Sequence, residues 1–494
     1  MRVIIANRSV FPFHPPGGLE KYIFYFSRAL RQEGVEVEVV ASVPPGGERR
    51  VQLDGVSYTF LPPAVSWERP FAVGPSLGGF FLSLNLARYL RGRRFDILHA
   101  YNTLPYVYVR LPGRAAVVCQ PFEEVLNFGL GGEERLSLAQ RVAVSAKRHM
   151  DRYILTHADA VAYDPEVLGD AFVRFFDVRR DRLFNLPVGV DIVTVDAALK
   201  GYRLSREEVG LGEGDFVLIS VNRLLPIKGL NYLVDAFAKI AQKIPSARLV
   251  LVGAGPEEGA LYKQTEELGL WGKVLHWRNV PDERLYRLYA LADLYVSPTL
   301  HIGTTQSIIE AMACGLPVVS TGDQGYWVRE GINGYVVPKR DPEALAQAVI
   351  KVFHQQRGQP LREASRSIAL QYDFRNIARK AIAEYERILS GKRSVHNATW
   401  ARMHHRPGAR GPDTGMRKRI SLTTVGRSLS ISEASTSRWG GRGPSRRACG
   451  SCGSTSAQVM PFDSSGGASG GPPTCAWSRS GGWPTCSSAT SPTS

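Results

Sequence analysis

Two basic side chains flank a turn in the middle of the chain. Arg223 and Lys228 lie five residues apart in Val221–Gly229, a segment that follows an apolar run and precedes a helical pattern. An arginine supplies two parallel N–H donors and a lysine a compact charge, so the pair could hold one diphosphate. A solvated basic loop is the alternative, but the position after a strand favours an anion-binding site.

Three further segments carry residues that could bind the same ligand. Gly17 and Gly18 stand between a strand and a helix, where backbone N–H groups can approach an anion, although a structural turn explains them equally well. Gly253 and Gly255 follow another strand in the same way. Glu310 lies in an apolar helix, and a buried carboxylate needs a partner. The two hydroxyls of a ribose would suit it, and a structural ion pair is the alternative.

The elements that position these residues follow one pattern. Short β-rich runs alternate with helical patterns, which indicates parallel βαβ units of an α/β fold. We expect two Rossmann-like parallel-sheet domains facing across a cleft, with ligands at the carboxyl ends of the strands. The expected parts are a first domain at 1–200, a linker at 201–214, a second domain at 215–370, a closing helix at 371–390 and a tail at 391–494.

The net charge of +16 is concentrated in the expected tail. Residues 391–494 contain 14 Lys and Arg against 3 Asp and Glu, which accounts for +11. The remainder is mildly basic, as suits a protein that binds an anionic small molecule and no nucleic acid. The tail is rich in Ser, Gly, Arg and Pro, and is either disordered or the product of a shifted reading frame. Nucleic-acid binding through this tail is an alternative function.

Cysteine usage and hydropathy predict a cytoplasmic chain without a metal site. Cys119 and Cys314 are isolated in apolar surroundings, and the pair Cys449 and Cys452 lacks a second pair at metal-binding spacing. The apolar run at the N-terminus is too short for a signal peptide, and no stretch favours a membrane span. The basic segment 135–152 could contact anionic lipid on the inner face of a membrane, although a solvated helix face explains it as well.

Together the motifs resemble the group 1 retaining glycosyltransferases of GT-B fold (GT4-like), the family typified by sucrose synthase and bacterial mannosyltransferases. The similarity runs from Met1 to about Ser390. Its motifs, in order, are Gly17-Gly-Leu-Glu20, Asp96-Ile-Leu-His99, Gly189-Val-Asp191, Asn222–Gly229, Gly253-Ala-Gly-Pro256, Ala292-Asp293, Glu310–Pro317, Gly331-Ile-Asn-Gly334 and Tyr372-Asp-Phe374.

The resemblance implies an enzyme of class EC 2.4 that transfers a sugar from a nucleoside-diphosphate sugar with retention. It implies no cofactor and no metal, and the chain has no Asp-x-Asp triplet. Arg223 and Lys228 would stabilise charge on the leaving diphosphate, and Glu310 would hold the ribose. The implied acceptor is a glycan, a lipid-linked or a small molecule, as in polysaccharide biosynthesis. The implied donor-binding residues are Gly17, Gly18, Asn222, Gly253, Gly255, Ser307 and Ile309.

One position departs from the family pattern at the sugar. Ile302 stands eight residues before Glu310, where relatives commonly carry a glutamate that contacts the transferred sugar. His301, Thr304 or Thr305 could take its place. Losing one charged hydrogen bond costs roughly 1.5–3 kcal/mol. A catalytically impaired nucleotide-sugar-binding homologue is therefore the alternative function.

A second departure concerns the acceptor side. Gln120 stands where many relatives place a histidine near the reacting centre, and glutamine cannot titrate. His99, at the end of its strand, is either an acceptor contact or a buried, hydrogen-bonded residue. A sugar-nucleotide epimerase of the same fold, a further alternative, would need a base near the sugar, and no good candidate occurs.

Overall fold

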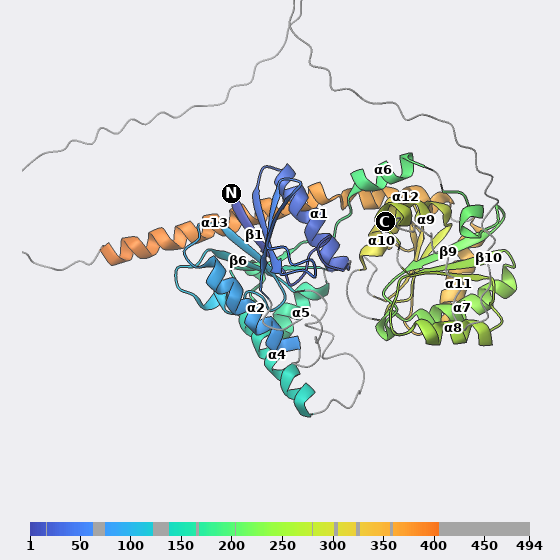
Figure 1. Cartoon of the computed structure of the whole chain (residues 1–494), viewed down its shortest axis with the longest axis horizontal. Helices are drawn as coiled ribbons and strands as arrows, with labels where there is room; N and C mark the ends of the chain where they lie inside the picture. The colour runs from blue at the N-terminus through green and yellow to red at the C-terminus, as the bar shows by residue number, and fades with distance from the viewer. Residues whose placement is uncertain are drawn as a thin grey trace, which may run out of the picture. The chain divides into compact units, whose positions relative to one another are not determined.

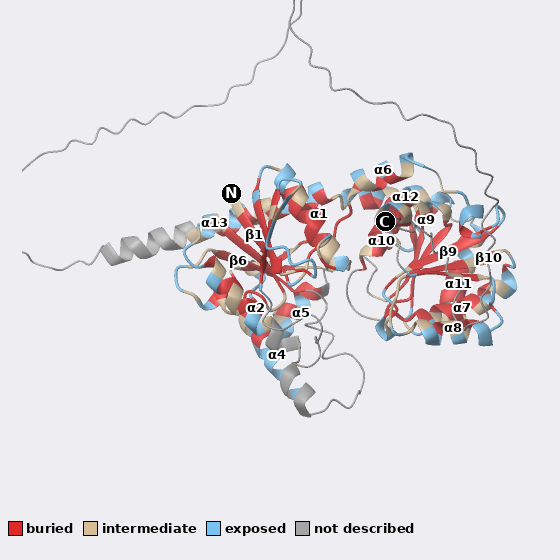
Figure 2. Cartoon of the chain, viewed as in Figure 1, coloured by how far each residue is buried: buried red, intermediate tan, exposed pale blue. Residues whose placement is uncertain are grey.

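The computed structural model describes residues 1–404 except 16, 63–74, 122–137, 165–166, 203, 279, 301–304, 323–326 and 356–358. Two β-sheets, each covered by helices, organise this part of the chain (Figure 1). The central strands of both sheets are buried, and the exposed residues lie mainly on the outer sides of helices and in loops (Figure 2). The predicted α/β class with two parallel-sheet domains is confirmed.

The first sheet has eight strands in the order β3-β4-β2-β1-β5-β6-β7-β8. All neighbours are parallel except β3 and β4. Its central strands are apolar on both faces because helices cover both. The strands are β1 (Arg2–Ala6), β2 (Glu36–Ser42), β3 (Arg50–Leu53), β4 (Val56–Leu61), β5 (Ile97–Tyr101), β6 (Ala116–Gln120), β7 (Ala160–Tyr163) and β8 (Leu183–Asn185).

Alternate residues of β1 point to opposite helix layers. Val3 and Ile5 belong to a core cluster with α1 (Gly18–Gln32) and α13 (Phe374–His404). Ile4 and Ala6 belong to another with α2 (Pro75–Leu90) and α4 (Leu138–His157). The remaining helical segments of this domain are η1 (Tyr108–Arg110), α5 (Val167–Phe176) and η2 (Arg180–Arg182).

The second sheet has six strands in the order β11-β10-β9-β12-β13-β14, all parallel. The strands are β9 (Phe216–Val221), β10 (Ala247–Val252), β11 (Val274–Trp277), β12 (Leu294–Ser297), β13 (Val318–Thr321) and β14 (Gly334–Val337). Its helical segments are η3 (Glu207–Val209), η4 (Pro226–Lys228), α7 (Leu230–Lys243), α8 (Glu258–Glu267), α9 (Asp282–Leu291), α10 (Gln306–Ala313), α11 (Pro342–His354) and α12 (Gln359–Gln371). None of the described helices combines the length and apolar character of a membrane-spanning segment.

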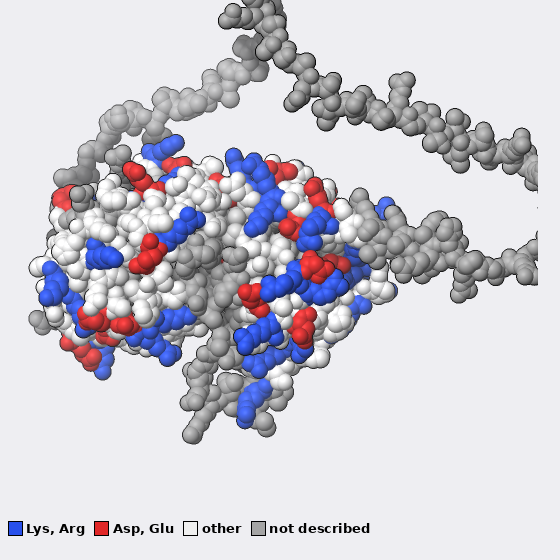
Figure 3. All heavy atoms as spheres, turned by 180° about the vertical axis from the view of Figure 1, so that it is seen from behind, with Lys and Arg blue, Asp and Glu red and all other residues white. Residues whose placement is uncertain are grey.

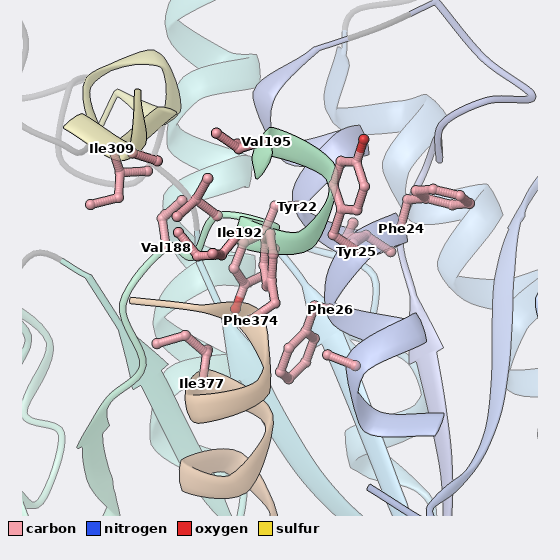
Figure 4. Close-up of a cluster of buried hydrophobic side chains, with 14 of the residues drawn as sticks. Tyr22, Phe24, Tyr25, Phe26, Val188, Ile192, Val195, Ile309, Phe374 and Ile377 are labelled. Carbon is pink, nitrogen blue, oxygen red and sulfur yellow. The ribbon is translucent and has the colours of Figure 1, made fainter. Parts of the chain in front are cut away.

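The chain passes between the two domains twice, and the two passages are hydrogen-bonded to each other. The Val190 N–H donates to the Tyr372 carbonyl at 3.0 Å, and the Phe374 N–H donates to the Val190 carbonyl at 3.1 Å. Figure 4 shows Val188 of the first passage and Phe374 of the second beside Tyr22 of α1. The ring centroids of Tyr22 and Phe374 are 5.6 Å apart. This packing joins both passages to the helix that follows Gly17 and Gly18.

The domain limits differ from those expected. Helix α6 (Ile192–Lys200) packs with the second domain, since the Arg287 Nε donates to the Ala198 carbonyl at 3.3 Å. Arg206, in the expected linker 201–214, forms an ion pair with Asp293 at 3.2 Å. The first domain therefore ends near residue 190 and the linker is part of the second. The closing helix continues to His404, beyond the expected residue 390.

Candidate functional site

The loop after β9 holds Arg223 and Lys228, and its backbone is fixed on two sides. The Leu224 N–H donates to the Ala254 carbonyl at 3.0 Å, on the loop after β10. On the other side, Leu300 of the loop after β12 donates its N–H to the Ile227 carbonyl at 2.9 Å. The Arg223 side chain is exposed, whereas Lys228 is only 9% exposed. Two cations are thus presented at the carboxyl edge of the second sheet by a rigid turn.

Glycines make this close loop packing possible. A Cβ on Gly253, whose φ is +139°, would lie 1.8 Å from the Asn222 carbonyl oxygen. A Cβ on Gly255 would lie 2.3 Å from the Leu224 carbonyl oxygen. Real Cβ atoms do not approach so closely, so both positions require glycine to shape the loop that presents Arg223. Their predicted contact with a donor stays a prediction.

Helix α10 begins against the end of β9. The Ser307 Oγ donates to the Val221 carbonyl at 2.8 Å and is 2.6 Å from the Tyr295 hydroxyl. Thr305 occupies the N-cap position without making a side-chain cap. The amino end of α10, which favours anions, therefore lies beside the loop of Arg223.

Buried polar atoms without partners gather at this edge. Among the described residues, the Asn222 Oδ1, the Thr305 Oγ1 and the Gln306 Oε1 are buried and accept no hydrogen bond. A buried polar atom left unpaired costs about 1–3 kcal/mol. Such atoms are rare in native structures, so three close in sequence to the Arg223 loop and the start of α10 indicate a place for a polar ligand.

Glu310 of α10 is buried close to an ion pair formed by Lys21 and Asp282. Glu310 is 5% exposed, and Lys21 of α1 pairs with Asp282 of α9. The Tyr25 hydroxyl donates to the Asp282 Oδ2 at 3.3 Å. Burial raises the pKa of Glu310 to about 7, although the Lys21 charge opposes this and the Asp282 charge adds to it. Burial alone would lower the pKa of Lys21, but Glu310 and Asp282 raise it.

The turn at Gly17 and Gly18 reaches the same helix. Gly17 is the N-cap of α1, and a Cβ there would lie 2.2 Å from the Glu20 Oε2. A Cβ on Gly18 would lie 3.6 Å from the Gln306 Oε1. The structure thus brings the predicted glycine turn, Glu310 and the start of α10 together.

Three predicted residues lie in the core instead. His99 is fully buried between the Tyr385 hydroxyl of α13 and the Gln120 Oε1, the latter at 3.1 Å. Burial lowers the pKa of His99 to about 4, although the Gln120 hydrogen bond opposes it. Gln120 is 1% exposed and Ile309 is fully buried in the cluster of Figure 4. Acceptor contact by His99 or Gln120, and side-chain contact of Ile309 with a donor, are therefore not what this structure presents.

Other predictions remain open, and some residues were not anticipated. His301, Ile302 and Thr304 lie outside the described residues. Lys21 and Asp282 carried no predicted role, because their pairing joins segments 261 residues apart. Only the position of Lys21 beside Gly17–Glu20 gave a signal.

Two family profiles match the chain. "Glycosyl transferase 4-like domain" matches residues 17–189, and "Glycosyl transferases group 1" matches residues 202–371. The two matches fall on the first and second domains in turn, and Val190 lies in the gap between them.

Individual relatives agree with these matches. Over 262 residues, 50% of this chain, the sequence is 29% identical to a GDP-mannose-dependent alpha-(1-6)-phosphatidylinositol monomannoside mannosyltransferase of Mycolicibacterium smegmatis, and the match spans 66% of that relative. Over 380 residues it is 27% identical to D-inositol 3-phosphate glycosyltransferase 2 of Catenulispora acidiphila, covering 70% of this chain and 86% of the relative.

Solved structures show the same fold. Sucrose-phosphate synthase from Thermosynechococcus elongatus superposes with a TM-score of 0.65 at 18% identity, covering 79% of this chain and 99% of that one. At that identity the likeness establishes the two-domain architecture and nothing finer.

Proposed function

We propose, because the chain belongs to the group 1 (GT4-like) glycosyltransferases of GT-B fold, that it transfers a sugar from a nucleoside-diphosphate sugar to an acceptor with retention and without a metal. The observation that carries the proposal is the fixed loop of Arg223 and Lys228 beside the unpaired buried atoms of Asn222, Thr305 and Gln306. Cations next to unpaired acceptors suit a ligand with both phosphates and hydroxyls.

Each group has a role in this proposal. Arg223 and Lys228 bind the diphosphate and stabilise the charge that develops as the sugar leaves. Ionised Glu310 accepts hydrogen bonds from the ribose hydroxyls. The backbone at Gly17 and Gly18, next to α10, closes over the phosphates. A phosphate oxygen of the donor can take the proton of the acceptor hydroxyl, so the transfer needs no protein base.

The acceptor class rests on the relatives. The names of the two relatives specify phosphatidylinositol monomannoside and D-inositol 3-phosphate as acceptors or substrates of those proteins. A glycan, lipid-linked or phosphorylated polyol acceptor is accordingly proposed here, with peripheral contact to a membrane in the lipid-linked case. Nucleic acid is not part of the proposal. On the face shown in Figure 3, basic and acidic side chains are interspersed over the described residues.

A binding homologue with impaired transfer is the second candidate. Ile302 supplies no carboxylate at the family position, and Gln120, which stands where many relatives place a histidine, is buried and cannot titrate. In that case the nucleotide-sugar donor binds, but its sugar is not transferred.

Donor binding and turnover, measured separately, decide between these candidates. The full chain is titrated calorimetrically with UDP-, GDP- and ADP-sugars, and nucleoside diphosphate release is followed with and without acceptors. Arg223→Ala is the test variant and Arg375→Ala, an exposed arginine on α13, is the matched control. Saturable binding with release, both lost only in Arg223→Ala, supports transfer. Binding without release under all conditions supports the homologue, and binding equal in both variants contradicts the assigned site.

A further inference from the structure

A basic hollow lies at the amino ends of the strands of the first sheet, at the edge opposite to the one that Gly17 and Gly18 follow. It has a volume of about 660 Å³, within the range of roughly 300–1,000 Å³ typical of small-molecule sites. Its walls come from the start of β1, the loop between α2 and β5, and the loop between η1 and β6. Its charged lining residues are Arg2, Arg91, Arg93, Arg94, Asp96 and Arg114.

Some of these arginines are neutralised by neighbours. Arg93 binds both oxygens of Glu38, at 2.9 and 3.2 Å, and Arg2 reaches the same carboxylate at 3.5 Å. Arg114 pairs with Asp159. These contacts neutralise three of the guanidinium groups, and neither Glu38 nor Asp159 lines the hollow itself.

Arg91 and Arg94 are different. Both are exposed, and among the described residues neither has a carboxylate within 4 Å. Both lie in the short turn that connects α2 to β5, so they are held at one rim of the hollow. These two uncompensated guanidinium groups make the rim suited to an anion with more than one charge.

The floor of the hollow is apolar. Leu90 and Tyr108 are nearly fully buried, at 2% and 4% exposed, so the accessible apolar lining comes from Phe95, Leu111 and Pro112. The Tyr108 hydroxyl is occupied, since it accepts from the Ala115 N–H at 3.2 Å. An anion alone would leave this surface uncovered, so the lining suits a molecule with a phosphate end and an apolar part.

We propose that this hollow, the arginine pocket, binds a phosphate- or diphosphate-bearing molecule at a site separate from the donor site. The pocket lies at the amino ends of β1, β5 and β6, whereas Gly17 and Gly18 follow the carboxyl end of β1. Strands of five residues place roughly 13–16 Å between these edges. Both sites can be occupied at once. The phosphate belongs either to a soluble metabolite or to a lipid headgroup.

The test counts pyrophosphate sites by calorimetry on the full chain. Wild type is expected to bind two pyrophosphates, one at Arg223 and Lys228 and one in the arginine pocket. Arg91→Gln/Arg94→Gln removes the second, with affinity there falling at least about tenfold. Arg174→Gln/Arg375→Gln, which removes two exposed arginines elsewhere, leaves both sites intact. A count unchanged by Arg91→Gln/Arg94→Gln, or equally changed by the control pair, overturns the proposal.

This design separates the arginine pocket from the proposed function. If the donor assignment is wrong, wild type binds one pyrophosphate that Arg223→Gln keeps and Arg91→Gln/Arg94→Gln loses. Vesicles of phosphatidylglycerol and of phosphatidylcholine then identify the source of the phosphate. Binding only to phosphatidylglycerol, displaced by pyrophosphate and lost in Arg91→Gln/Arg94→Gln, identifies a lipid headgroup. Pyrophosphate binding in the pocket without vesicle binding identifies a soluble ligand.

Discussion

Replacing Glu310 by glutamine should stabilise the fold and impair the donor site at the same time. The carboxyl is 5% exposed and burial raises its pKa to about 7, with Lys21 opposing the shift and Asp282 adding to it. The folded protein therefore carries a costly buried charge at neutral and alkaline pH. Other ionisable neighbours keep their protons in this range because burial raises their pKa values: Tyr25, Tyr286, Tyr289 and Cys314.

The size of the effect follows from the two pKa values. The folded-state pKa of Glu310 exceeds the ordinary value of 4.5 by about 2.5, and each pH unit corresponds to about 1.4 kcal/mol. Because the folded state binds the proton more tightly, the stabilisation is complete below pH 4.5 and is lost as the pH rises through 7. This group therefore lowers the free energy of unfolding by about 3 kcal/mol between pH 4.5 and pH 8, a loss that glutamine does not suffer.

Urea unfolding of both proteins at pH 5 and pH 8 measures this directly. The stability advantage of Glu310→Gln over wild type should grow by about 2.5 kcal/mol from pH 5 to pH 8, while its donor affinity at pH 8 falls at least about tenfold. Arg223→Ala serves as the control, since it should weaken donor binding without changing how the free energy of unfolding depends on pH. An advantage that is constant or shrinks with pH would refute the reasoning about the buried charge.

Three further changes have distinct expected results. Gly255→Ala places a Cβ 2.3 Å from a backbone carbonyl oxygen, so it should cost about 1–3 kcal/mol in thermal unfolding and weaken donor binding, whereas Gly259→Ala, whose Cβ meets nothing within 4 Å, should do neither. Tyr385→Phe removes the hydrogen bond to His99 and should cost about 1 kcal/mol of stability with donor affinity unchanged in calorimetry; a large loss of affinity would contradict a core role. Lys21→Met removes the positive charge that lowers the pKa of Glu310, so Glu310 becomes protonated at a higher pH. When the pH is lowered from 9 to 6, donor affinity, which needs ionised Glu310, should therefore be lost at a higher pH than in wild type.

Local patterns predicted what local interactions determine. The strands β9 and β14 coincide with short apolar runs of the sequence, Phe216–Val221 and Gly334–Val337. The Arg223 loop and the start of α10 also lie where strand-to-helix turns indicated, because carboxyl ends of neighbouring parallel strands share one edge.

Contacts between segments far apart in the sequence could not be predicted from local patterns. His99 is covered by Tyr385, 286 residues later in the chain, and no local pattern records such a pairing. The segment 201–214 has the polar, glycine-rich composition of a linker, yet the ion pair of Arg206 with Asp293 attaches it to the second domain. Composition gives the local propensity of a segment, whereas a buried long-range contact decides where it packs.

The return of α13 to the first domain sets an order for folding during synthesis. His99 leaves the ribosome 286 residues before Tyr385, the side chain that covers it. At about 5–20 residues per second this interval lasts on the order of 15–60 s. The whole second domain is made within it and can fold while one aromatic face of the first sheet is still uncovered. The nascent chain is therefore most prone to aggregation through its oldest part, until its last helix is translated.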